Sequence, residues 1–162
     1  MVAGAGRFDC RSAIQGPRTE LAKSTCGGAY QVATVKAIAL GANHSCALRN
    51  NGGIECWGLN ANGQIGLGDN KDAKLNIGDG PNEMGDNLPA INFGSNKTPT
   101  GITMGQYHAC AIFSDNSIKC WGSNTGGQLG LGDITGNNLN IGDGPDEMGD
   151  NLPTVKLFSN AW

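Results

Sequence analysis

The sequence predicts an all-β protein built from a tandem repeat, and three observations support this prediction. The chain of 162 residues matches itself at an offset of 64 residues without gaps. Within each repeat, short apolar segments are bounded by glycine and other turn-forming residues, which is typical of β-strands and hairpins. Apart from one helical turn expected at residues 17–24, no segment shows the period of 3.6 residues that predicts a helix.

The repeat defines the organisation of the chain. Over residues 41–89 aligned with 105–153, 29 of 49 positions are identical, including the long segments LNIGDGPNEMGDNLP and LNIGDGPDEMGDNLP. We therefore expect an N-terminal arm without a repeat match at 1–34, a first repeat at 35–98 and a second repeat at 99–162.

Each repeat is expected to contain the same strands in the same order. Glycine-bounded strands are predicted at 35–41 and 100–105. Hairpins follow at 44–58 and 108–122, with turn residues in NNGG and SDN. A further short strand is expected after each long loop, at 90–94 and at 154–158.

Composition excludes two classes of function. The net charge is −3 and no cluster of Lys and Arg occurs, so the chain lacks the basic surface that binds nucleic acid. No run of about 18 apolar residues predicts a membrane span, although docking on a membrane complex stays compatible with this. With 27 glycines and no G-X-Y period, the sequence indicates many turns.

Cysteine spacing agrees with the predicted hairpins. The six cysteines are Cys10, Cys26, Cys46, Cys56, Cys110 and Cys120. If the turns centre on Asn51 and Asp115, Cys46 faces Cys56 and Cys110 faces Cys120, close enough for cross-strand disulfides. Cys10 and Cys26 are then the remaining pair.

Three interpretations of these cysteines stay open. Disulfides imply an oxidising compartment, extracellular or in an organelle lumen, and buried free thiols imply a cytoplasmic protein. A zinc site of His44, Cys46 and Cys56 is the third, but it lacks the C-x₂-C spacing of common zinc sites.

The repeated motif closely resembles the repeat of the regulator-of-chromosome-condensation family. The residues that carry this resemblance are Gly41, His44, Cys46, Ala47, Cys56, Trp57, Gly58, Asn60, Gly63, Gln64, Gly66, Gly68 and Asp69, with their counterparts 64 positions later. The resemblance covers about residues 35–158. It implies that each repeat supplies most of one four-stranded blade of a β-propeller, which usually has seven blades, and that GQ[IL]GLGD is a turn of the blade.

Two repeats imply a partial β-propeller with long loops and an irregular N-terminal arm. Because a closed ring is what hides strand edges in a propeller, we expect exposed edges here. The chain should therefore assemble with itself, dock on a partner through these edges and the arm, or form part of a longer protein. The inserted GDGPxEMGDNLP segment resembles versions of the repeat from bacteria and unicellular algae, which makes the thylakoid lumen one candidate compartment.

Candidate site residues recur at equivalent positions. His44 and His108 have no accompanying nucleophile and carboxylate in a recognisable order, so they are interpreted as repeat-core residues that hydrogen-bond a neighbouring blade. Trp57 and Trp121 are interpreted as core residues between blades.

The long loops carry acidic residues that are candidates for binding a basic partner: Asp79, Glu83, Asp86, Asp143, Asp146, Glu147 and Asp150. Calcium binding through carboxylate oxygens is an alternative, although the spacing differs from the D-x-[DN]-x-[DN]-G loop. Solvated turns capped by Asp and Asn are the third interpretation.

These features favour a non-enzymatic protein-interaction or scaffold module that is a subunit of a larger assembly. No catalytic residue, cofactor or resident metal is predicted. The alternative is a regulatory propeller-type binder of a GTPase or another enzyme.

Overall fold

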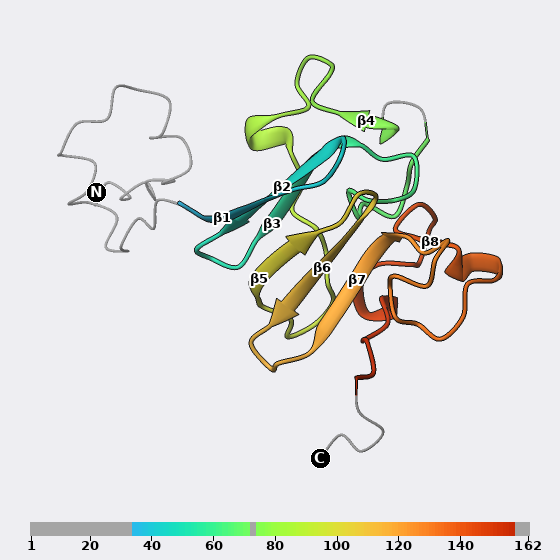
Figure 1. Cartoon of the computed structure of the whole chain (residues 1–162). Helices are drawn as coiled ribbons and strands as arrows, with labels where there is room; N and C mark the ends of the chain where they lie inside the picture. Colours follow the sequence, from blue (N-terminus) through green and yellow to red (C-terminus); the bar gives the residue numbers. More distant parts are fainter. Residues whose placement is uncertain (1–33, 72–73, 158–162) are drawn as a thin grey trace, which may run out of the picture. The chain divides into compact units, whose positions relative to one another are not determined.

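The computed structural model describes residues 34–71 and 74–157, and these form two four-stranded antiparallel sheets (Figure 1). The first sheet contains β1 (Val35–Leu40), β2 (His44–Arg49), β3 (Ile54–Leu59) and β4 (Asn76–Ile77), in that order. The second contains β5 (Pro99–Met104), β6 (His108–Phe113), β7 (Ile118–Ser123) and β8 (Asn140–Ile141). The described residues also contain three short 3₁₀ turns: η3 (Gly85–Asn87), η4 (Gly136–Asn138) and η5 (Gly149–Asn151). The all-β prediction is confirmed.

The register of both hairpins is the predicted one. Cys46 faces Cys56 across β2 and β3, and Cys110 faces Cys120 across β6 and β7. In both pairs the Cα atoms are 4.1 Å apart and the structure joins the sulfur atoms in a disulfide. The expected pair Cys10–Cys26 and the helical turn at 17–24 lie outside the described residues.

The strands predicted after the long loops are wrong. Each sheet takes its fourth strand from two residues inside the loop, β4 and β8, whereas Ala90 and Thr154 make only single bridges to Glu55 and Lys119. After Ala90 the chain turns away at Gly94, whose φ is 91° and whose N–H donates to Asn92 Oδ1 at 2.9 Å. This turn ends the pairing before a regular strand can form.

The faces of the two hairpins contribute to one core. We call the side that carries His44, Cys46 and Leu48, with its counterpart at His108, Cys110 and Ile112, the front face. The opposite side, with Ala109, Ala111, Phe113 and Trp121 in the second sheet, is the back face. The core contains the front face of the first sheet and the back face of the second, and β1 and β2 both contact β5. The repeats therefore pack front to back.

Aromatic residues fill the centre of this core. Phe93 lies in the segment between η3 and β5, which ends the first repeat and links it to the second. It makes edge-on contacts with Phe113 at 5.1 Å and with Trp121 at 5.2 Å between ring centroids. Phe93 is 4 % exposed and the other two rings are almost fully buried. The segment that links the repeats is thus held by the second sheet.

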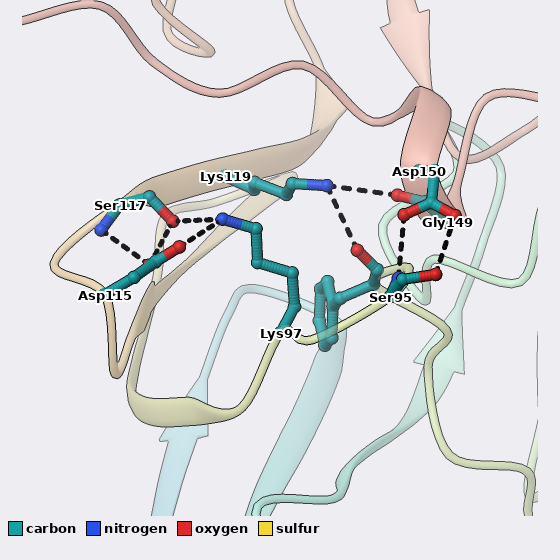
Figure 2. A network of polar contacts seen from close by, with 8 residues as sticks. Ser95, Lys97, Asp115, Ser117, Lys119, Gly149 and Asp150 are labelled. Carbon is teal, nitrogen blue, oxygen red and sulfur yellow. Dashed lines mark hydrogen bonds and ion pairs between the residues drawn. The ribbon is translucent and has the colours of Figure 1, made fainter.

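A buried lysine also holds the linking segment. Lys119 on β7 is 3 % exposed, and its Nζ donates to the carbonyl oxygens of Phe93 and Gly149, both at 3.0 Å (Figure 2). Beside it, the Asp150 carboxylate accepts from the Ser95 N–H at 2.7 Å. Burial lowers the pKa of Lys119, with a further contribution from the charge of Lys97. The ammonium group therefore joins the end of the first repeat to the η5 loop of the second.

The two histidines are packed against glycine. A Cβ atom at Gly41 would clash with the His44 imidazole, and one at Gly105 would clash with His108. The expected hydrogen bond to a neighbouring repeat is not found for His44, because neither of its buried ring nitrogens has a partner among the described residues. Burial, and secondarily the nearby His108, lowers the pKa of His44 to about 4; burial also lowers that of His108.

Replacing Lys119 with methionine is expected to lower the free energy of unfolding by about 2 kcal/mol. The buried Phe93 carbonyl oxygen loses the lysine donor, and the Gly149 carbonyl oxygen keeps only the Leu152 N–H at 3.4 Å. Urea denaturation measures the change. Lys156→Met, at an exposed position, is the control and should change stability by less than about 0.5 kcal/mol. Equal stability of K119M and the wild type would contradict the role of Lys119.

Acidification is expected to destabilise the fold before the carboxylates titrate. Below pH 6.5 the unfolded chain binds a proton at position 44, whereas folded His44 does so only near pH 4. The stability present above pH 6.5 is therefore lost as the pH falls, by about 2 kcal/mol at pH 4.5 from His44. Denaturation series between pH 7 and 4.5 should show a shallower pH dependence for His44→Gln, with His108 accounting for the remainder. An unchanged slope in H44Q would contradict the assignment.

Candidate functional site

Two equivalent glycine-rich loops follow β3 and β7, and we call residues 63–68 the first loop and residues 127–132 the second loop. A buried asparagine shapes the first. Asn60 Nδ2 donates to the carbonyl oxygens of Asp69 at 2.8 Å and Lys74 at 2.9 Å, and its Oδ1 accepts from the Ile65 N–H at 3.0 Å. Asn60 is fully buried, so the loop conformation is fixed from inside.

Asn124 shapes the second loop in the same way. Its Nδ2 donates to the carbonyl oxygens of Asp133 at 2.9 Å and Asn138 at 2.7 Å, and its Oδ1 accepts from the Leu129 N–H at 3.0 Å. The repeat motif contains Asn60, but its local sequence predicts no role for either asparagine. The signal was an Asn three residues after each CWG tryptophan, directly before a glycine-rich loop.

The first loop docks on the second sheet, at a surface formed by Trp121, Ile141 and Gly142 that we call the second docking surface. The Gly68 N–H donates to the Gly142 carbonyl oxygen, and Trp121 Nε1–H donates to the Gln64 carbonyl oxygen, both at 3.0 Å. This contact brings backbone against backbone.

Glycine is required where the loop touches that surface. Gly63 has a φ of 73°, and a Cβ added there would lie 2.7 Å from the Ile141 carbonyl oxygen. A Cβ at Gly66 would lie 2.9 Å from Trp121 Nε1. A side chain at either position would therefore separate the two sheets.

The equivalent surface of the first sheet, formed by Trp57, Ile77 and Gly78, has nothing docked on it among the described residues. We call it the first docking surface. These three residues line an open hollow together with Leu59. Trp57 is only half-buried whereas Trp121 is fully buried. Trp121 contacts the first loop, and a role of both tryptophans as core residues between blades stays a prediction.

The second loop is correspondingly uncovered. No described atom lies within 4 Å of a Cβ built at Gly127 or at Gly132. Gln128 is exposed, whereas its counterpart Gln64 is fully buried. The two loops therefore share a shape and differ in their surroundings.

The front face of the second sheet is also open. Ile112 is 43 % exposed, whereas Leu48 at the same position of the first sheet is fully buried. A hollow on this face is lined by Ile112, Ile118, Leu129, Val155 and Leu157, among others. An apolar surface built like the core of the first repeat therefore faces solvent.

Two of the acidic loop residues serve their own turns. The Glu83 carboxylate accepts from the N–H groups of Gly78 at 2.7 Å and Gly80 at 2.8 Å, and these bonds lower its pKa. Glu147 accepts in the same way from residues 142, 143 and 144.

The other acidic residues are dispersed. Asp150 is engaged by Ser95, and Asp143 Oδ2 accepts from Asn140 Nδ2 at 3.3 Å. Asp79, Asp86 and Asp146 are exposed, and binding of a basic partner through them stays a prediction. Within residues 34–71 and 74–157 no group of three or more candidate metal ligands occurs, and no helix there is long and apolar enough to cross a membrane.

Comparison with known proteins agrees with this architecture. Residues 35–64 and 100–128 match the family model described as the regulator of chromosome condensation (RCC1) repeat. The chain is 33% identical over 101 residues to the ultraviolet-B receptor UVR8 of Arabidopsis thaliana, covering 62% of this chain and 20% of the receptor. It is 31% identical over 119 residues to the X-linked retinitis pigmentosa GTPase regulator of Mus musculus, covering 73% of this chain and 11% of that protein. The chain thus spans a fifth or less of these relatives.

Two solved structures share the fold. Human WBSCR16 superposes with a TM-score of 0.52 at 22% identity, over 82% of this chain and 27% of that one. Prp20p of Saccharomyces cerevisiae gives a TM-score of 0.51 at 17% identity, over 80% and 27%. The chain is therefore built from two repeats of the regulator-of-chromosome-condensation type, which form two adjacent four-stranded blades of a partial β-propeller.

Proposed function

We propose that this chain is a non-enzymatic protein-interaction module that acts as a subunit of a larger assembly. The observation that carries the proposal is the open front face of the second blade. Leu48 is fully buried in the first blade, whereas its counterpart Ile112 is 43 % exposed and lines an apolar hollow on this face. Exposed apolar surface of this kind marks interaction sites in soluble proteins.

A second candidate is regulation of a GTPase through the same face. It is favoured by the similarity to the X-linked retinitis pigmentosa GTPase regulator and by the shared fold with Prp20p, which has been studied for its binding to Gsp1p and histones. Capture of a GTPase at the front face, with faster nucleotide release from it, would support this candidate over a scaffold.

We also propose an oxidising compartment, supported by the two cross-strand disulfides. The thylakoid lumen stays a prediction from the resemblance. Alkylation of protein taken from its source, denatured without reductant, should leave Cys46, Cys56, Cys110 and Cys120 unlabelled. After reduction all four should react. Labelling of the four thiols before reduction would contradict the proposal.

A photo-crosslinking residue at position 112 is expected to form an adduct with another polypeptide in the source cells, because a partner covers this side chain. Position 134 is the matched control: Ile134 is 45 % exposed, close to the 43 % of Ile112, but lies on a loop outside the front face. Mass spectrometry of the adducts gives the result. If crosslinking at 112 does not exceed that at 134, the interaction function is contradicted.

A further inference from the structure

We propose that the partner is a second copy of this chain, which docks head to tail. The second loop of one copy occupies the first docking surface of the next, and the open front face meets the back face of the neighbouring first blade. This inference rests on the proposed function and names the partner of that site.

The second loop and the first docking surface, which are both uncovered, match in sequence the first loop and the second docking surface, which contact each other. The second loop reads GQLGLG and the first loop GQIGLG, so they differ only by Leu in place of Ile. The first docking surface carries Trp57, Ile77 and Gly78 where the second carries Trp121, Ile141 and Gly142. Every group of the loop contact, as distinct from the back face beside it, is thus present a second time.

The second loop and the first docking surface already have the backbone conformation of their counterparts that contact each other. Gly127 has a φ of 77° and Gly63 one of 73°, and Gly130 has 67° where Gly66 has 75°. On the receiving side, the φ of Gly78 is 98° and that of Gly142 is 96°. Neither surface has to reorder in order to bind, which removes a main cost of association.

The open halves lack the contacts that the closed pair makes. Trp121 Nε1–H donates to the Gln64 carbonyl oxygen, but Trp57 Nε1 has no such acceptor among the described residues. The Gly68 N–H donates to the Gly142 carbonyl oxygen, whereas the Gly132 N–H makes no hydrogen bond among the described residues. Docking of a second copy supplies both bonds and covers Ile112.

The new contact is weaker than the internal one, because its back face is more polar. Arg49 and Glu55 stand where the second blade has Phe113 and Lys119, and they form an ion pair at 2.6 Å. Leu157 replaces Phe93 in the facing segment. We therefore expect association in the micromolar range, roughly, rather than a permanent complex.

The two contacting surfaces differ, so the interface is heterologous. An open assembly therefore keeps one free second loop and one free first docking surface until a ring closes. Light scattering of the purified full chain should give an average mass that rises with concentration from 16.7 kDa and reaches at least twice that value above the micromolar range. A mass of 16.7 kDa across the micromolar range overturns the inference without requiring any variant.

Glycine substitutions test the geometry. Gly127→Asn adds a side chain where a docked loop has no room, yet no described atom lies within 4 Å in the single chain. Gly136→Asn is the matched control, since it also has a positive φ and open space but lies outside the second loop. G127N should weaken assembly at least tenfold and G136N should leave it unchanged. Equal assembly of the two variants overturns the inference.

Mixing identifies the head-to-tail arrangement. Gly78→Asn blocks the first docking surface, because a Cβ at its counterpart Gly142 would lie 2.6 Å from the Gly63 carbonyl oxygen. At Gly78 the Cβ would meet the exposed Met84 side chain at 3.2 Å and the Trp57 Cβ at 3.9 Å. G78N and G127N should each be monomeric, and their mixture should form a 1:1 dimer that grows no further. Failure of the mixture to dimerise, with both variants folded, overturns the arrangement.

The two proposals fail in distinguishable ways. If the purified chain is monomeric while position 112 crosslinks to a different protein in cells, only the second-copy inference is lost. If the chain is monomeric and position 112 yields no adduct, both are lost.

Discussion

The arrangement of the two blades depends on one contact, in which a glycine loop lays its backbone against the backbone of the next blade. The Gly68–Gly142 hydrogen bond and the close approach of Gly63 to Ile141 leave no room for side chains. Asn60 fixes the loop before it docks, so the contact does not have to order a flexible segment. With the two blades placed by this contact, the aromatic cluster around Phe93 and the buried Lys119 pack between the end of the first repeat and the second sheet.

The proposed interaction follows from the repeat. The contact between the repeats joins a glycine loop of one repeat to a docking surface of the other. The described residues contain two such loops and two such surfaces, and one of each is uncovered. Ile112 and Leu48 occupy the same place in their blades, yet the first is exposed and the second buried. The front face of the second sheet is exposed and resembles the front face of the first sheet, which is buried against a back face. A back face of the same kind, from a second copy, is therefore the simplest surface to cover it.

The hairpins could be predicted from the sequence, because a turn centred on Asn51 sets the pairing of every residue in β2 and β3. The two-residue strand β4 could not, since two residues carry no alternating pattern. The roles of Asn60 and Asn124 depend on carbonyl groups nine to fourteen residues away, which no local pattern indicates. The difference between the two docking surfaces could not be predicted either. Trp57 and Trp121 lie in similar local sequences, and they differ only in the residues that contact them in the folded chain.

Amide hydrogen exchange at Gly68 and Gly132 tests the central claim most directly, because these two residues share a motif and a backbone conformation and differ in docking. In dilute protein the Gly68 amide should exchange slowly and the Gly132 amide rapidly, and the Gly132 amide should become protected as the concentration rises. Rapid exchange at both positions would show that the first loop is not docked on the second blade. Rapid exchange at Gly132 at every concentration would show that its loop has no partner in a second copy.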